Sequence, residues 1–365
     1  RAESCLGSGG DGAISLVSVS MDSRSGCGSG CIPRGRSGGR RPARAHLPEL
    51  TGNHGQAQDQ GPGKGPGGYD GFSAHRMIDV GEECTSSPLW VKDVDASSHE
   101  LGCEEIEAML ANNTRLVGEG RVRKVYLAEY GDQTVAVKVL QHQDQLNRHR
   151  IEVATMDAVR GNPYIVQTLG ICNTMVVTEA FTLTLSSAMR QRTTALPIGE
   201  AVTMSLDAVR GLQALHEVVG GPIVHFNLKP PQILVTGIGH VKLNDFNVAW
   251  FMSRGPDGKP CPFNMGYEHR GQNSPWRSPE YHARKPMTEK IYIYTMGLIF
   301  LKAIAGDSMR MPVAQVSEDP VPVFATTWHR SYYEIAQDMI VEEPKRRPSA
   351  REVAWRLRAI LEELP

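Results

Sequence analysis

Glycine is distributed so unevenly along this 365-residue chain that a packed core is confined to its later part. Residues 1–71 contain 18 of the 37 glycines, interleaved with Ser, Arg and Pro. Such a segment buries too little apolar surface to offset the conformational entropy that is lost on ordering. We therefore predict a disordered arm and linker over residues 1–100, followed by one folded domain over residues 101–365.

The arm contains a basic run, Arg34 to Arg44, that could contact RNA or an anionic surface. The run lacks interleaved aromatic side chains on which bases could stack. With 39 Lys+Arg against 40 Asp+Glu, the whole chain has a formal net charge of -1 and attracts no polyanion through bulk charge. We predict a solvated linker and no specific nucleic-acid partner.

The apolar stretches and the cysteines indicate in which cellular compartment the protein works. The longest apolar stretch, Ile291 to Leu301, is too short for a bilayer, which takes roughly 20 residues, so we expect no membrane span. The seven cysteines are irregularly spaced, unlike the framework of a small secreted domain, and favour a reducing compartment. Cys27 and Cys31 have no second pair at zinc spacing and are interpreted as unpaired thiols. We predict a cytoplasmic or nuclear protein, not secreted as far as the visible chain shows.

Periodicity divides the folded part in two. Apolar spacing indicates a helix over 101–110 and another over 145–160, and alternation around Gly131-Asp132 indicates a hairpin. Two further strands are expected over 165–172 and 175–180. Helices are then expected over 202–215, 291–305, 333–341 and 351–364, with a second hairpin formed by 233–235 and 241–243.

The strand-rich part has features of a phosphate site. Gly118-Glu119-Gly120 opens the first hairpin, where absent side chains let backbone N–H groups approach phosphate oxygens. Val135-Ala136-Val137-Lys138 places one lysine on an otherwise apolar strand, and Glu152 lies on the next helix. A buried lysine needs a partner such as Glu152. On a half-exposed strand Lys138 would instead be an ordinary surface residue, and the residues alone leave both interpretations open.

Further motifs follow in order along the helical part. They are His225-Phe226-Asn227-Leu228-Lys229-Pro230-Pro231-Gln232, Asp245-Phe246-Asn247, Ser278-Pro279-Glu280, Met296-Gly297 and Arg347-Pro348. Any one of these matches is common, but their joint order and spacing are not. With these motifs the chain resembles the eukaryotic protein kinase family, over roughly residues 112–362.

The resemblance implies a nucleotide site, position by position. The residues that match nucleotide-binding positions are Gly118, Gly120, Val125, Ala136, Lys138, Glu152, Thr178 and Glu179. Lys138 looks like the lysine that holds the α- and β-phosphates, and Glu152 looks like its helix partner. Thr178 and Glu179 look like the hinge, whose backbone would hydrogen-bond adenine. Asp245 matches the carboxylate that ligates Mg²⁺, so the resemblance implies ATP and Mg²⁺ as cofactors.

The chain departs from the family pattern within this site. Arg123 stands where a third glycine would be, which would impair close backbone approach to the phosphates. Asn227 replaces the catalytic aspartate, and an amide has no useful basicity for accepting a hydroxyl proton. Gln232 replaces the second metal-binding Asn, with the same oxygen donor on a longer stem, so a shifted metal site with Asp245 is expected.

Other departures concern the supports of the site. Asn247 replaces the glycine of Asp-Phe-Gly, and Asn is among the few other residues that tolerate positive φ. Phe226 replaces the loop arginine, and Tyr292 stands where the family usually has an aspartate that braces the catalytic loop. We expect that brace to be rebuilt from aromatic residues or absent. Glu280 and Arg347 are similar to the buried ion pair that fixes the end of the activation segment.

The sequence thus predicts an α+β, two-lobed protein-kinase-like fold, with a β-rich N-lobe over about 112–180 and a helical C-lobe over about 181–362. The resemblance implies phosphoryl transfer from Mg²⁺-ATP to protein hydroxyls, with Asn227 and Lys229 in the catalytic loop. Leu228-Lys229-Pro230 looks like the serine/threonine branch. The alternative is a pseudokinase with little or no turnover, acting as a nucleotide-binding or scaffold module. A protein substrate or signalling partner is expected in both cases, and the sequence indicates no oligomeric state.

Overall fold

The structure, a computed structural model, describes residues 77–79, 83–88, 94–112, 114–192, 194–265, 274–306 and 326–365. These residues belong to one compact unit. Residues 1–71 of the arm and linker predicted over 1–100, which include the basic run and Cys27 and Cys31, lie outside the described residues. Within the described residues, no helix combines the length and the apolar character that a bilayer crossing requires.

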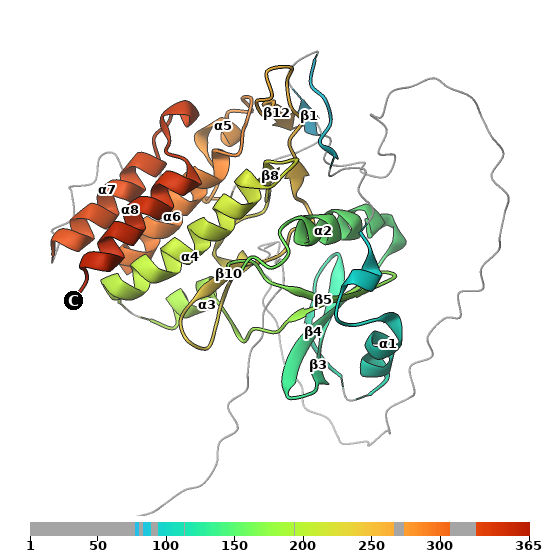
Figure 1. The fold of residues 1–365 in the computed structure, drawn as a ribbon. Helices are drawn as coiled ribbons and strands as arrows, with labels where there is room; N and C mark the ends of the chain where they lie inside the picture. Colours follow the sequence, from blue (N-terminus) through green and yellow to red (C-terminus); the bar gives the residue numbers. More distant parts are fainter. Residues whose placement is uncertain are drawn as a thin grey trace, which may run out of the picture. The chain divides into compact units, whose positions relative to one another are not determined.

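The N-lobe is a five-stranded antiparallel sheet in the order β2-β3-β4-β6-β5, with one helix on each face (Figure 1). Its elements are α1 (Cys103–Ala111), β2 (Arg115–Glu119), β3 (Arg123–Tyr130), β4 (Gln133–Leu140), α2 (Leu146–Ala158), β5 (Thr168–Cys172) and β6 (Met175–Glu179). The predicted hairpin is confirmed: Gly131 takes φ +56° in the two-residue turn between β3 and β4, which suits glycine.

Strand alternation decides which side chains of β4 face the site, because successive side chains of a strand point to opposite faces. Val135 and Val137 pack against Ile106 of α1. Ala136 faces the other way and packs with Val125 and Leu127 of β3. Lys138 lies two residues further along and shares that second face, on which α2 also packs. The sequence pattern therefore aims Lys138 toward α2 and the site.

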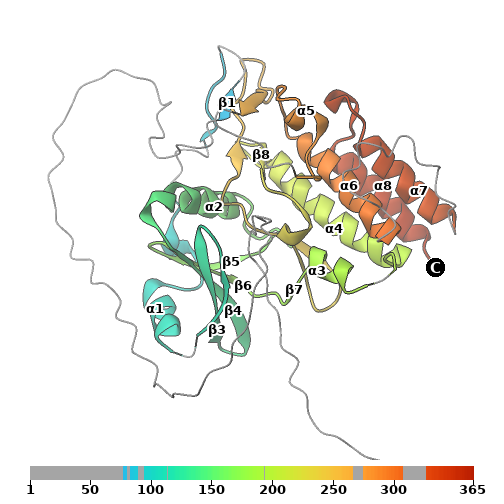
Figure 2. The same cartoon turned by 180° about the vertical axis from the view of Figure 1, so that it is seen from behind.

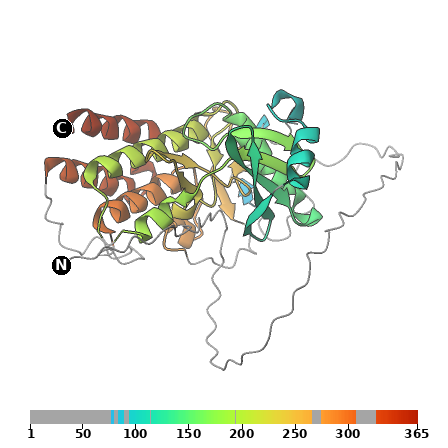
Figure 3. The same cartoon turned by 90° about the horizontal axis from the view of Figure 1, so that it is seen from below.

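The C-lobe is built around four long helices, which Figures 2 and 3 show packed together beyond the strands of the N-lobe. Its helices are α3 (Leu185–Arg190), α4 (Ile198–Glu217), α5 (Pro279–His282), α6 (Ile291–Ala305), α7 (Thr327–Met339) and α8 (Ala350–Glu363). Its short strands are β7 (Leu183–Thr184), β8 (Ile223–Val224), β9 (Ile233–Val235), β10 (Val241–Leu243) and β11 (Trp250–Phe251). The predicted helix over 291–305 and the second hairpin are confirmed.

Helix α6 forms the centre of the C-lobe core. Its apolar run is buried almost all round, which explains why the stretch has no polar face. Gly297 lets α7 approach closely, because a Cβ atom at this position would lie 2.8 Å from Cβ of Met339. The longest apolar stretch of the sequence is therefore an interior helix.

A short segment before the domain is bonded to the C-lobe. Strand β1 (Met77–Asp79) pairs antiparallel with β12 (Phe263–Met265), and Thr85 forms a bridge with Arg254. Cys84 is joined to Cys261 by a disulfide. The described parts of residues 77–88 therefore contact the folded domain, although the sequence assigned them to a linker that ends at residue 100.

Two disulfides pair four of the cysteines, which the reducing compartment favoured from the sequence did not lead us to expect. Besides Cys84 and Cys261, Cys103 of α1 is joined to Cys172 of β5. The partners are 177 and 69 residues apart in the chain, so no local spacing indicates the pairing. One disulfide therefore ties the segment around Cys84 to the C-lobe, and the other ties α1 to the N-lobe sheet.

The predicted ion pair in the C-lobe is confirmed. Arg347 donates two hydrogen bonds to the Glu280 carboxylate, at 2.6 and 2.8 Å, and both side chains are buried. The same guanidinium also donates to the carbonyls of Lys290, Val341 and Glu342. The pair is fully hydrogen-bonded and connects α5 to the turn before α8.

We predict that Glu280→Ala lowers the free energy of unfolding by roughly 3 to 5 kcal/mol, because it leaves a buried guanidinium without its counter-charge. Denaturant unfolding followed by circular dichroism measures this loss. Glu217→Ala is the matched control, since its pair with Arg351 is exposed and such pairs contribute at most about 1 kcal/mol. Equal losses in the two variants would contradict the assigned role of the buried pair.

Candidate active site

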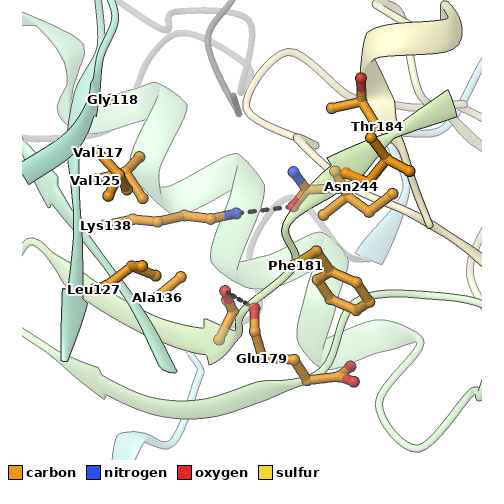
Figure 4. Close-up of a pocket in the computed structure, with 13 residues that line it drawn as sticks. Val117, Gly118, Val125, Leu127, Ala136, Lys138, Glu179, Phe181, Thr184 and Asn244 are labelled. Carbon is orange, nitrogen blue, oxygen red and sulfur yellow. Dashed lines mark hydrogen bonds between the residues drawn. The ribbon is translucent and has the colours of Figure 1, made fainter. Parts of the chain in front are cut away.

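A pocket of about 490 Å³, counting space open to solvent, lies between the N-lobe sheet and β9 (Figure 4). Apolar side chains form most of its wall, with Val117, Val125, Leu127 and Ala136 from the N-lobe and Phe181, Leu183 and Leu234 from the other side. The site residues predicted from sequence that line it are Gly118, Val125, Ala136, Lys138, Thr178 and Glu179. Six of the predicted nucleotide residues are therefore brought together.

Lys138 is buried, so the interpretation of this residue as an ordinary surface lysine is wrong. Its Nζ atom lies 3.2 Å from Oε1 of Glu152 and 2.9 Å from Oδ1 of Asn244. Figure 4 shows the side chain reaching across the pocket toward Asn244. The predicted pairing of Lys138 with Glu152 is present, and Asn244 joins it as a partner that sequence reasoning missed. The position of Asn244 directly before Asp245 was the one sequence signal that could have indicated this contact.

Arg123 does more than occupy a glycine position. Its side chain is turned inward from the first residue of β3, with Nε 2.7 Å from Oε2 of Glu152 and Nη2 3.0 Å from Nδ1 of His149. Gly120 stays in its loop, where its N–H donates to the Arg123 carbonyl at 2.9 Å. Gln141 donates to the Gly120 carbonyl. The loop is thus closed by its own backbone, and Glu152 has two cationic partners.

The two cations control the protonation of this cluster. Burial raises the pKa of Glu152, but the nearby charges of Arg123 and Lys138 outweigh it and lower that pKa to about 2. Burial, with Arg123 next, lowers the pKa of His149 to about 4. At neutral pH the cluster therefore contains an ionised carboxylate, two cations and a neutral imidazole.

The two predicted hinge residues, Thr178 and Glu179, make different contacts. Thr178 is buried, and its hydroxyl donates to the backbone carbonyl of Glu179 at 3.1 Å. The Glu179 carboxylate points elsewhere, toward Lys242 at 2.6 Å and the backbone N–H of Gln167. One acceptor site of the Glu179 carbonyl is therefore used within the protein. Phe181 was missed from the sequence because nothing distinguishes it there from a core aromatic residue.

His225 holds the loop that contains Asn227, the predicted catalytic loop. Burial lowers the pKa of His225 to about 4, so its ring is neutral at pH 7. Nε2 lies 2.9 Å from the carbonyl of Asn244 and must carry the proton, since a carbonyl only accepts. Nδ1 is then free to accept from the backbone N–H of Asn227 at 3.4 Å. This histidine links the loop to Asn244, which lies between β10 and Asp245.

The brace expected to be either rebuilt or absent is rebuilt. The Tyr292 hydroxyl accepts from Arg277 Nη1 at 3.1 Å and from the backbone N–H of Leu228. Arg277 also donates to the carbonyl of Phe226 at 3.0 Å, and its guanidinium lies 5.6 Å from that ring. Burial raises the pKa of Tyr292 to about 12, so the hydroxyl stays protonated. A tyrosine and an arginine thus hold the loop backbone.

The predicted metal ligands form a sparse set. Burial, followed by the charge of Glu152, raises the pKa of the Asp245 carboxyl. Asn247 donates from its amide to Oδ1 of Asp245 at 2.5 Å. The positive φ expected at Asn247 is found at Asp245 instead, at 66°. Gln232 is buried, and among the described residues its Nε2 has no hydrogen-bond partner.

The roles predicted for Lys229 and Asn227 in the catalytic loop stay predictions. Lys229 is half-buried, and its charge lowers the pKa of Asp245 against the effect of burial. Asn227 is also half-buried. Across the described ranges no group of three His, Cys, Asp or Glu side chains could hold a metal ion alone. An ion here would need oxygens from a ligand such as phosphate, which is how Mg²⁺ is commonly bound.

Comparison with known proteins agrees with this geometry. A family model of the protein kinase domain matches residues 111–356. The chain belongs to the protein kinase family. Serine/threonine-protein kinase 12 of Arabidopsis thaliana is 29% identical over 315 residues, covering 80% of this chain and 65% of that protein. Dual specificity protein kinase shkA of Dictyostelium discoideum is 27% identical over 290 residues, covering 75% and 54%. The chain thus spans less than two thirds of these relatives.

We predict that Tyr292→Phe destabilises this kinase domain by roughly 1 to 3 kcal/mol, because the buried N–H of Leu228 loses its acceptor. The loss is measured by denaturant unfolding. Tyr294→Phe, two residues further along α6 and only half-buried, is the control and should change stability by much less. A loss no larger than that of the control would show that the hydroxyl does not brace the loop.

Proposed function

We propose that this kinase domain binds ATP with Mg²⁺ and transfers the γ-phosphoryl group to protein Ser/Thr hydroxyls slowly. The observation that carries the proposal is the assembled contact of Lys138 with Glu152 at the pocket of about 490 Å³. A lysine fixed in this way presents a positive charge to a phosphate group without further reorganisation. Relatives named as serine/threonine kinases support the class of acceptor.

The site residues have the following proposed roles. Val125 and Ala136 pack against the base, and backbone groups of Thr178 and Glu179 hydrogen-bond its edge. Gly118 and Gly120 cover the phosphates, to which Lys138 supplies positive charge while Glu152 orients it. Asp245 and Gln232 supply the protein oxygens for Mg²⁺, and Lys229 stabilises the transferred group. When bound, the metal neutralises charge on the phosphates.

Asn227 limits the reaction. A positioned general base contributes typically ~10²- to 10⁴-fold, and an amide cannot fill that role. The remaining stabilisation comes from alignment and charge, which this site retains in Lys138, Lys229 and Asp245. A protein substrate follows from the family, and its identity stays open.

A pseudokinase is the second candidate, and two observations favour it. Asn227 lacks the basicity for proton abstraction, and Arg123 takes one oxygen of Glu152. In this case the domain binds nucleotide and signals by conformation. Turnover separates the two candidates, because both bind ATP.

The compartment is also a proposal. The sequence favoured a reducing cytoplasmic or nuclear compartment, but disulfides persist mainly in oxidising compartments. The structure contains Cys84–Cys261 and Cys103–Cys172. We therefore propose that the domain works in an oxidising environment.

We predict that Mg²⁺-ATP raises the melting temperature of the protein by several degrees, since at 100-fold over Kd binding stabilises the fold by about 2.7 kcal/mol. Lys138→Ala should reduce this shift strongly and still fold, because Arg123 keeps Glu152 paired. Lys124→Ala, whose side chain is 39% exposed on the neighbouring strand, is the control. Identical melts with and without nucleotide would favour an interaction scaffold with an empty cleft.

We predict that Asn227→Asp raises the rate of phosphoryl transfer by roughly 10²-fold, because it restores a carboxylate that can accept the hydroxyl proton. Transfer from labelled ATP to serine, threonine and tyrosine peptides measures the rate, and Asn227→Ala is the uncharged control. If Asn227→Asp binds nucleotide but stays inert, the pseudokinase candidate holds. Ordinary rates of about 1 to 100 per second in the unaltered protein would refute the assignment of Asn227.

We predict that the protein isolated from its own cells carries both disulfides. Peptide mapping after alkylation, without reduction, should recover Cys84 linked to Cys261 and Cys103 linked to Cys172. Alkylation of all four thiols on lysis would contradict the proposed oxidising compartment.

A further inference from the structure

The environment of Arg123 suggests a role beyond closing the loop. The side chain is 7% exposed, and its guanidinium shares the Glu152 carboxylate with Lys138. Nη2 contacts His149, but Nη1 is buried and has no hydrogen-bond partner among the described residues. A buried, unpaired donor on a cation is costly unless an acceptor arrives. This donor belongs to the first residue of β3, directly after the loop that would cover the phosphates.

The charge balance of the cleft points to the nature of that acceptor. With glycine at position 123, the charged groups around Asp245 beside the pocket would be Lys138 against Glu152 and Asp245 itself, one net negative charge. With Arg123 the same set is neutral. Lys229 is common to both cases and adds one positive charge. A triphosphate therefore meets a more positive cleft here than the glycine pattern would provide, and needs less help from a metal ion.

The metal ligands point in the same direction. Asp245 already accepts from the Asn247 amide at 2.5 Å, and Gln232 replaces a shorter side chain. Neither feature excludes a divalent cation, but both weaken the oxygen set available to it. The cleft has therefore gained a fixed cation and kept only a sparse metal site.

We propose that Arg123 is a second fixed cation for the phosphates of ATP, and that the domain consequently binds ATP without a divalent metal ion. The guanidinium keeps Nε on Glu152 and uses the unpaired Nη1 to donate to a phosphate oxygen. Lys138 is held by Glu152 and Asn244 beside it. This inference rests on the proposed function, because it concerns the same nucleotide.

The test is an ATP titration of the full chain, by calorimetry, in Mg²⁺ and in excess EDTA. The unaltered protein should lose less than tenfold in affinity when the metal is removed. Arg123→Met removes the charge but keeps an unbranched side chain, and should lose roughly ten- to hundredfold in EDTA, the value of a charge-assisted hydrogen bond. Arg121→Met is the matched control, since Arg121 is exposed in the same loop. It should bind like the unaltered protein.

A second variant at position 123 checks that a loss of binding in Arg123→Met is not caused by misfolding. Arg123→Gly restores the residue of the family pattern and should also lose metal-free binding, while Glu152 stays paired with Lys138. A cooperative melt of each variant shows that the fold is retained. The measurement on the unaltered protein does not depend on either variant.

The outcomes separate the two proposals. Tight binding in Mg²⁺ that falls tenfold or more in EDTA overturns the inference and leaves the proposed function standing. Metal-free binding that survives in Arg123→Met and in Arg123→Gly overturns the role of Arg123. No binding in either buffer overturns the proposed function, and this inference with it.

Discussion

The site depends on one buried carboxylate, Glu152, which is held between two cations. A buried charge is tolerated only when it is paired and hydrogen-bonded. Lys138 and Arg123 each occupy one oxygen, so the ion pair connects α2 to both β3 and β4. Glu152 of α2 therefore pairs with a strand lysine, Lys138, as the family pattern requires. Arg123 is a second cation on the same carboxylate. Removing either cation leaves Glu152 with a partner, which separates stability from ligand binding at this position.

The catalytic loop shows a similar separation between scaffold and chemistry. Tyr292 and Arg277 hold the backbone at Leu228 and Phe226, and His225 holds Asn227. The loop is thus fixed by groups other than a carboxylate. The residue that it presents, however, is an amide. Alignment of the site and loss of its base coexist, which is why nucleotide binding and turnover have to be measured separately.

Periodicity and motif order were sufficient for most of the architecture. The hairpin at Gly131, the interior helix α6 and the strands around Gly239 follow from local patterns, because each buries a face that its own residues define. The pair of Glu280 with Arg347 followed from the family resemblance. The contact between Lys138 and Glu152 also followed from the family resemblance. Strand alternation places the lysine on the face of β4 on which α2 packs.

Contacts that depend on three-dimensional closure could not be predicted. The inward turn of Arg123 is decided by the space beside His149 and Glu152, which no neighbouring residue in sequence reveals. Disulfide partners far apart in the chain have no local signature. Strands β1 and β12 are also far apart in the chain, so their pairing has no local signature either. Asn244 was overlooked although it precedes Asp245, because a single asparagine after a short strand belongs to none of the motifs.

The most direct test of the two-cation cleft is a crystal structure of the protein with a non-hydrolysable ATP analogue, grown without divalent metal ions. The account predicts that the guanidinium of Arg123 stays on Glu152 while a second nitrogen lies within hydrogen-bond distance of a phosphate oxygen. A nucleotide bound with Arg123 turned out to solvent would contradict it, as would a cleft that remains empty at saturating analogue.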